Sequence, residues 1–167
     1  MRRLWSLIPI LLLGSVLGFA QETVPPGVPS ESQESPGIRE RNPVLLVPGW
    51  MGRSIDLMAL KERLVRDGWS PGEVFPMEFL DPVGSSVEHA EELERSLENI
   101  VRETGAEAVD IIAHSMGGLA VWVLLQKRGS LLPVGKVVFL ATPFQGTVTA
   151  HLAWGEGGPE MIPGSQF

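Results

Sequence analysis

The feature that most constrains the fold is an alternation of short apolar runs with amphipathic segments between residues 43 and 141. The first run, Val44-Leu45-Leu46-Val47, is apolar at every position and is followed by Pro48-Gly49. Such runs are typical of strands buried on both faces, as in parallel sheets. Three further strands are predicted, at residues 73–79, 108–113 and 136–141.

Helices are predicted between these strands. One covers residues 56–67, with Asp56 as its N-cap and Gly68 at its end, and another covers residues 117–128. Between them, Ser85-Ser86-Val87-Glu88 has the pattern of a capping box that opens a long helix, which ends before Gly105. Strict alternation of strands and helices predicts an α/β fold, with a parallel sheet and right-handed crossovers.

The N-terminus has the pattern of a targeting segment. Arg2 and Arg3 precede an apolar stretch at residues 4–17, and small residues stand at the two positions that signal peptidase reads in Gly18-Phe19-Ala20. Residues 1–20 are therefore predicted to be a signal peptide, and the alternative is an uncleaved anchor. Both interpretations predict export, to the periplasm or the extracellular space.

Two further segments lack periodicity. Residues 21–42 are rich in Pro, Gly and Ser and are predicted to be a disordered linker, because they contain too little apolar surface to offset the entropy of ordering. Residues 43–167 form the predicted domain, although the helix and strand pattern fails after residue 141.

Composition excludes several classes of function. The chain has no cysteine, which rules out disulfides, thiol catalysis and cysteine-ligated metal. Its formal charge of −7 gives no basic footprint for nucleic acid. We expect no nucleic-acid partner, and the oligomeric state stays open.

The run from Val109 to Gly118 carries the chemistry. An apolar strand leads into Ser115, which stands between small residues, and an apolar helix follows. This is the layout of a nucleophile elbow, in which a tight turn lifts a serine hydroxyl above the sheet and aims a helix N-terminus at it. Ala113 and Gly117 occupy the two positions where bulk would collide with neighbouring elements. The alternative is a chance pattern at a strand–helix junction.

The chain here resembles the small bacterial class 2 lipases, whose elbow reads Ala-His-Ser-Met-Gly, as residues 113–117 do. The resemblance runs from about Asn42 to Leu140 and includes Asp67-Gly68-Trp69-Ser70 and Asp81-Pro82-Val83-Gly84-Ser85. It implies an α/β-hydrolase-type three-layer sandwich with a mostly parallel sheet. It also implies a secreted serine hydrolase that cleaves lipid or other hydrophobic esters through an acyl-enzyme, with no cofactor and no metal.

The resemblance further implies roles for individual residues. Ser115 matches the nucleophile, and the backbone N–H groups of Trp50 and Met116 match the oxyanion-hole donors. Ala113, His114 and Gly117 complete the elbow. Pro48-Gly49 departs from the family's His-Gly and is similar to lecithin:cholesterol acyltransferase-like proteins, so acyl transfer is an alternative to hydrolysis. Phe144, where related esterases have histidine, is either a residue packed on the core or a wall of the acyl site.

A serine nucleophile needs a histidine base and an orienting carboxylate, which follow it in the order acid then histidine in this fold. After Ser115 the chain has no aspartate, and His151 precedes both Glu156 and Glu160. His114 is too close in sequence to reach the hydroxyl, and His89 is predicted to be solvated. We therefore expect the final strands, the acid and the histidine to lie beyond residue 167. Two alternatives stay open: His151 acts as a makeshift base, or the chain is a non-catalytic hydrolase fragment.

Overall fold

The computed structural model of the chain describes residues 41–165. The predicted signal peptide and all but the last two residues of the predicted linker lie outside the described residues. In the described part of the chain, no helix is both long enough and apolar enough to cross a membrane.

The described residues contain a parallel sheet of four strands in the order β2-β1-β3-β4. These are β1 (Val44–Val47), β2 (Val74–Pro76), β3 (Val109–His114) and β4 (Val134–Leu140). All four residues of β1 are buried, which fits its central place in the order and its unbroken apolar sequence. The predicted parallel α/β sheet is confirmed.

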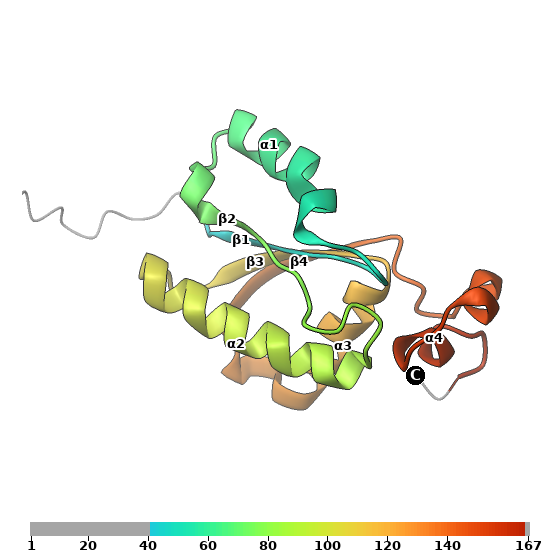
Figure 1. Cartoon of the computed structure of the whole chain (residues 1–167). Coiled ribbons are helices and arrows are strands. Elements are labelled where there is room, and N and C mark those ends of the chain that lie inside the picture. Colours follow the sequence, from blue (N-terminus) through green and yellow to red (C-terminus); the bar gives the residue numbers. More distant parts are fainter. Residues whose placement is uncertain (1–40, 166–167) are drawn as a thin grey trace, which may run out of the picture. The chain divides into compact units, whose positions relative to one another are not determined.

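Helices cover both faces of the sheet, which gives three layers (Figure 1). Helix α1 (Met58–Arg66) packs on one face, and its apolar residues join Val44 and Leu46 in one core. Helices α2 (Ser86–Thr104) and α3 (Met116–Arg128) cover the other face and enclose the larger core. The two cores use alternate residues of the same strands, because successive strand side chains point to opposite faces.

Helix α2 forms where its end signals predicted. The Ser85 hydroxyl accepts the N–H of Glu88, and the Glu88 carboxylate accepts the N–H of Ser85. Gly105 ends the helix in the left-handed conformation with φ 65°. Apolar residues recur along its buried side and pack under the sheet: Ala90, Leu93, Leu97 and Ile100.

Two predicted elements differ from the structure. A 3-10 turn, η1 (Ser54–Leu57), precedes α1, and the cap of this turn is Arg53. Asp56 is not the N-cap: its carboxylate instead accepts the Arg53 N–H at 2.8 Å from inside the turn. Strand β2 is three residues long and not seven, and it stops at Pro76, whose nitrogen has no hydrogen to donate to a ladder.

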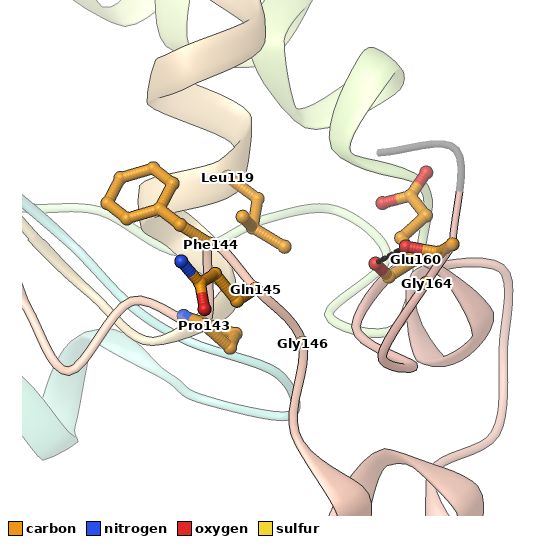
Figure 2. Close-up of a pocket in the computed structure, with 8 residues that line it drawn as sticks. Leu119, Pro143, Phe144, Gln145, Gly146, Glu160 and Gly164 are labelled. Atoms are coloured by element: carbon orange, nitrogen blue, oxygen red, sulfur yellow. Dashed lines mark hydrogen bonds between the residues drawn. The ribbon is translucent and has the colours of Figure 1, made fainter.

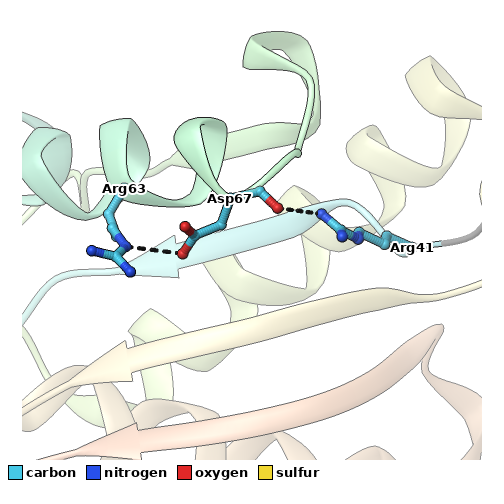
Figure 3. A network of polar contacts seen from close by, with 3 residues as sticks. All are labelled: Arg41, Arg63 and Asp67. Atoms are coloured by element: carbon cyan, nitrogen blue, oxygen red, sulfur yellow. Dashed lines mark hydrogen bonds and ion pairs between the residues drawn. The ribbon is translucent and has the colours of Figure 1, made fainter.

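The last two residues of the predicted linker belong to the folded domain. The Arg41 guanidinium donates to the Asp67 carbonyl at 2.6 Å and lies over the Trp69 ring, with 4.7 Å to its centroid. Figure 3 shows the hydrogen bond from Arg41 to Asp67 next to the ion pair between Arg63 and Asp67. Asn42 donates to the Asp110 carboxylate at 2.9 Å. These contacts attach the chain's entry to the end of α1 and to β3.

Residues 142–165, here called the tail, are more ordered than their sequence pattern predicted. They contain a 3-10 helix, η4 (Val148–Leu152), and a single helical turn, α4 (Gly157–Glu160). Ala150 and Met161 are buried in a third core together with Met116 and Leu119 of α3. The tail lies beyond the carboxyl ends of the strands (Figure 1), and Ser115 directly follows the carboxyl end of β3. Two further 3-10 turns complete the described elements, η2 (Pro71–Glu73) and η3 (Gly129–Leu131).

Candidate active site

Ser115 stands at the turn between β3 and α3, as the elbow pattern predicted. Its backbone has φ 51° and ψ −128°, a conformation that is costly for any residue with a Cβ. The turn is held on two sides: the Ser115 N–H donates to the Leu140 carbonyl of β4 at 2.8 Å, and its carbonyl accepts the Gly118 N–H at 3.0 Å. Surrounding hydrogen bonds therefore maintain the strain that lifts the hydroxyl out of the strand.

The elbow is wedged between the loops that follow β1 and β4. A Cβ added at Gly117 would collide with the Pro48 carbonyl oxygen, and one added at Gly118 would collide with the Thr142 side chain. A Cβ at Gly49 would lie 2.8 Å from the Ser115 Cβ. The sequence pattern indicated a small residue at position 117 but not at positions 49 and 118, because the constraint on Gly49 and Gly118 comes from segments distant in the chain.

Ala113 and His114 end the strand that leads into the turn. Ala113 is fully buried and lies between Val47 of β1 and Phe139 of β4 in the sheet register. The methyl group that replaces the usual glycine hydrogen is therefore accommodated. His114 is exposed and lines the cavity beside Ser115.

The two residues predicted to supply the oxyanion hole are both neighbours of Ser115: Met116 follows it in the chain, and Trp50 lines the same cavity. Met116 is the first residue of α3, and Trp50 directly follows Gly49, which touches the elbow. Within the described residues, neither the Trp50 N–H nor the Met116 N–H has a hydrogen-bond partner. Unpaired backbone donors at a helix N-terminus and in an adjoining loop are the groups that an oxyanion needs. Their role stays a prediction.

A cavity of about 530 Å³ opens beside Ser115. It lies between the elbow, the loop after β1 and the start of α1, and its wall is mostly apolar. Its lining residues are Pro48, Gly49, Trp50, Met51, Gly52, Asp56, Leu57, Ala59, Leu60, His114, Ser115 and Leu140. A mainly apolar cleft of this size with a few polar groups at one end suits a small hydrophobic ligand.

The cavity lining contains one histidine, His114, and one carboxylate, Asp56, among the described residues. The Asp56 carboxylate is already used by the Arg53 N–H. His151 is exposed on η4 and is not part of the lining. The structure therefore brings Ser115 and Trp50 together but places no described histidine–carboxylate pair beside them.

His89 is not solvated, contrary to the expectation from its acidic neighbours. It is 1% exposed, its ring stacks on Phe79 at 3.8 Å between centroids, and its Nε2 lies 2.7 Å from the Asp81 carbonyl. A carbonyl can only accept, so Nε2 carries the proton and the buried Nδ1 is left without a partner. Position 89 lies on the inner face of α2, and the charged residues next to it in the sequence do not indicate which face of the helix it occupies.

Phe144 packs against other aromatic rings and does not form a wall of the Ser115 cavity. Its ring meets those of Phe139 and Trp122 edge-on, with centroids 5.1 and 5.9 Å apart. It also borders a separate small cavity of about 60 Å³, whose lining includes Leu119 and Glu160 (Figure 2). Of the two interpretations of Phe144, the structure supports the packed residue.

Backbone strain gathers at the same edge of the sheet. Among the described residues, three that are not glycine have positive φ: Met51 at 56°, Ser115 at 51° and Ala141 at 52°. Each lies within four residues of the carboxyl end of β1, β3 or β4. Strain of this kind concentrates at functional sites in proteins. No group of three His, Cys, Asp or Glu side chains in residues 41–165 is arranged to hold a metal ion.

The parallel sheet with helices on both faces has the arrangement of the α/β-hydrolase fold, and comparison with known proteins agrees. Residues 42–164 match the alpha/beta hydrolase fold family, so the chain belongs to this family. The resemblance that we inferred from the elbow and from the segments around it is confirmed at the level of the α/β-hydrolase family.

Solved structures share the fold at low sequence identity. Phospholipase PlaB from Legionella pneumophila, in complex with thio-NAD, is 17% identical with a TM-score of 0.64, over 74% of this chain and 31% of that one. Lipase BlEst2 from Bacillus licheniformis, in its mature form, is 21% identical with a TM-score of 0.58, over 69% and 46%. The lin2722 gene product from Listeria innocua is 16% identical with a TM-score of 0.55, over 66% and 55%. This chain thus spans about a third to a half of the length of these proteins.

Proposed function

We propose that the chain carries the nucleophile and oxyanion hole of a serine carboxylic-ester hydrolase of the lipase or esterase type. One observation carries the proposal: strained Ser115 opens onto a mostly apolar cavity, near two backbone N–H groups that have no hydrogen-bond partner among residues 41–165. Membership of the α/β-hydrolase family and the fold shared with a lipase and a phospholipase support it.

In the proposed reaction, the Ser115 oxygen attacks the ester carbonyl and its proton passes to a base. The carbonyl oxygen becomes an oxyanion that accepts hydrogen bonds from the N–H groups of Trp50 and Met116. Collapse of this intermediate expels the alcohol, which takes the proton from the base, and leaves an acyl-enzyme. Water, deprotonated by the same base, then releases the acid and restores Ser115.

The base and its carboxylate are proposed to come from outside these 167 residues. The described histidines support this: His89 is buried against Phe79, His114 adjoins the nucleophile, and His151 stands apart from the cavity. The greater length of the three comparison structures is in keeping with it. The chain alone is then a weak esterase, since an oxyanion hole without a complete triad retains little of the rate.

The substrate is proposed to be a lipid or another hydrophobic ester. The lining of the cavity beside Ser115 is mostly apolar, with Leu57, Leu60 and Leu140 among its side chains. Burial of an acyl chain there contributes binding free energy of about 0.8 kcal/mol per methylene.

The decisive experiment compares three proteins on short p-nitrophenyl esters: the 167-residue chain, a form extended through a downstream acid and histidine, and the extended form with Ser115→Ala. We expect strong turnover only in the extended form with Ser115 intact. Ser70→Ala, at an exposed serine with no side-chain cap bond, is the matched control and should keep full activity. Strong Ser115-dependent turnover by the 167-residue chain would show that it supplies its own base, and no turnover in the extended form would favour a non-catalytic protein.

Acyl transfer is the second candidate, and Pro48-Gly49 before Trp50 favours it. In this reaction an alcohol replaces water in the second step, while Ser115 and the oxyanion hole keep their roles. To separate hydrolysis from acyl transfer, the extended protein is supplied with an ester and a long-chain alcohol. The amounts of new ester and of free acid are then compared. Mostly free acid at high alcohol concentration would exclude a dedicated acyltransferase.

We further propose that the protein is exported and begins at Gln21 after cleavage. The charged, apolar and small-residue regions of residues 1–20 support this. Mass spectrometry of the protein expressed with these residues is the test, and an intact Met1 on cytoplasmic protein would contradict it.

A further inference from the structure

The indole ring of Trp50 is held by a residue of the tail. Its Nε1–H donates to the Trp154 carbonyl at 3.0 Å, and the two rings meet edge to face with centroids 4.6 Å apart and an angle of 77°. The residues are 104 positions apart in sequence. The pair therefore joins the loop that contains one proposed oxyanion donor to a segment with no other assigned purpose.

The loop around Trp50 needs such support. Met51 has a strained backbone with φ 56°, and its N–H donates to the Pro82 carbonyl at 2.9 Å. A strained residue keeps its conformation only when its surroundings hold it. Since the Trp50 N–H has no hydrogen-bond partner within the described residues, its direction depends on how the rest of the loop is fixed.

Trp154 is itself fixed by its neighbours in the tail. Gly155, with φ 77°, lies against Val83 so closely that a Cβ there would collide with the Val83 carbonyl. Gly157 donates its N–H to that same carbonyl at 3.0 Å. A Cβ at Gly157 would lie 2.5 Å from the Met116 sulfur. One short segment therefore contacts both residues that are proposed to stabilise the oxyanion.

We propose that Trp154 is a positioning residue that keeps the Trp50 backbone N–H directed at Ser115. The inference rests on the proposed function, because an oxyanion at Ser115 is what gives that direction a purpose. Trp154 acts through Trp50, by the ring contact and by its carbonyl. It is itself 59% exposed, so its substitution disturbs little of the core.

The first test asks whether Trp154 holds the loop, with no reference to catalysis. Amide hydrogen exchange is measured by NMR on the 167-residue chain and on its Trp154→Ala, Trp154→Phe and Trp122→Ala variants. Loss of the ring contact should speed exchange of the Met51 N–H about tenfold, and phenylalanine should restore much of the protection. Trp122→Ala is the matched control, because Trp122 is also half-exposed and forms an edge-on pair with Phe144. This variant should leave the exchange rate of the Met51 N–H unchanged. Unchanged exchange in Trp154→Ala overturns the proposal.

The second test asks whether the oxyanion hole depends on Trp154. The Ser115 oxygen adds to the boron of butylboronic acid and releases a proton, and the resulting tetrahedral anion presents an oxygen to both N–H groups. Boron NMR measures its affinity, which should fall about fivefold in Trp154→Ala and stay constant in Trp122→Ala. Equal affinity in Trp154→Ala, even with lower stability, reduces Trp154 to a structural residue and contradicts the proposal. This titration is made on the form extended through the downstream acid and histidine. If that form makes no adduct that Ser115→Ala abolishes, the proposed function fails instead, and the exchange measurement on the 167-residue chain still decides whether Trp154 holds the loop.

Discussion

The elbow holds Ser115 and the tail contacts Trp50 and Met116, but different interactions hold the two regions in place. The elbow continues a strand that is hydrogen-bonded on both sides, and its glycines press against backbone and side chains of two other loops. The tail contains no β-strand, so no ladder of backbone hydrogen bonds joins it to the sheet. Two short turns anchor it through Ala150 and Met161, while Val148 and Leu152 remain largely exposed.

This difference indicates that the site combines a rigid part with a weakly held part. Close contact with backbone leaves the elbow no room to adjust, because a carbonyl cannot move aside as a flexible side chain can. A small apolar cluster contributes little to stability, so the tail should open without unfolding the sheet. The conformation of Ser115 then depends on the stability of the whole fold. The conformation of Trp50 depends partly on the local equilibrium between the closed and the opened tail.

The largest effect is expected from Gly117→Ala. The added Cβ collides with the Pro48 carbonyl oxygen, and we expect the free energy of unfolding to fall by about 3 kcal/mol. Urea denaturation followed by far-UV circular dichroism measures the change. Gly72→Ala is the control, because a Cβ there meets nothing within 4 Å. Equal stabilities of the two variants would show that the elbow is not wedged and would remove the contrast with the tail.

A smaller and local effect is expected from Met161→Ala. Truncating this buried side chain should favour opening of the tail by about 2 kcal/mol, or about 30-fold in the exchange rate of the Thr147 N–H, which donates to the Met161 carbonyl. Exchange in β3 should not change. Met58→Ala, at a half-exposed methionine on α1, is the comparison variant. Faster exchange in both the tail and β3 would mean that the two regions unfold as one unit.

The smallest effect is a gain in stability. Ser115→Gly removes the Cβ that makes φ 51° unfavourable and should raise the free energy of unfolding by about 1 kcal/mol, net of the greater freedom of glycine in the unfolded chain. Ser115→Ala keeps the Cβ and should show no such gain. Thermal denaturation of both variants makes the comparison. A glycine variant no more stable than the alanine variant would mean that the elbow stores no strain at Ser115.

Several features could be predicted because they depend on local sequence. Helix α2 was found from a capping box and Gly105, whose effects act over one turn of helix. Strand β1 was found from four apolar residues, a pattern that suits burial on both faces. Prediction of the elbow required only an apolar strand, a serine after it and the small residue at position 117. Chain order and neighbouring residues contain all of this information.

Other features depended on contacts between distant segments. His89 was predicted to be solvated because acidic residues surround it in sequence, but the packing of Phe79 and the Asp81 carbonyl placed it inside. The tail has no periodicity because its order comes from single residues, such as Met161, that fit against α3.

The sequence by itself determined the α/β alternation, the family and the position of Ser115, since these follow from propensities and spacing along the chain. Only the tertiary structure decided that Gly49 and Gly118 must be glycine, and that Trp154 meets Trp50 across 104 residues. The physical reason is that steric contact and hydrogen bonding act over a few ångströms in space. A sequence read one segment at a time does not show which distant atoms come within that range.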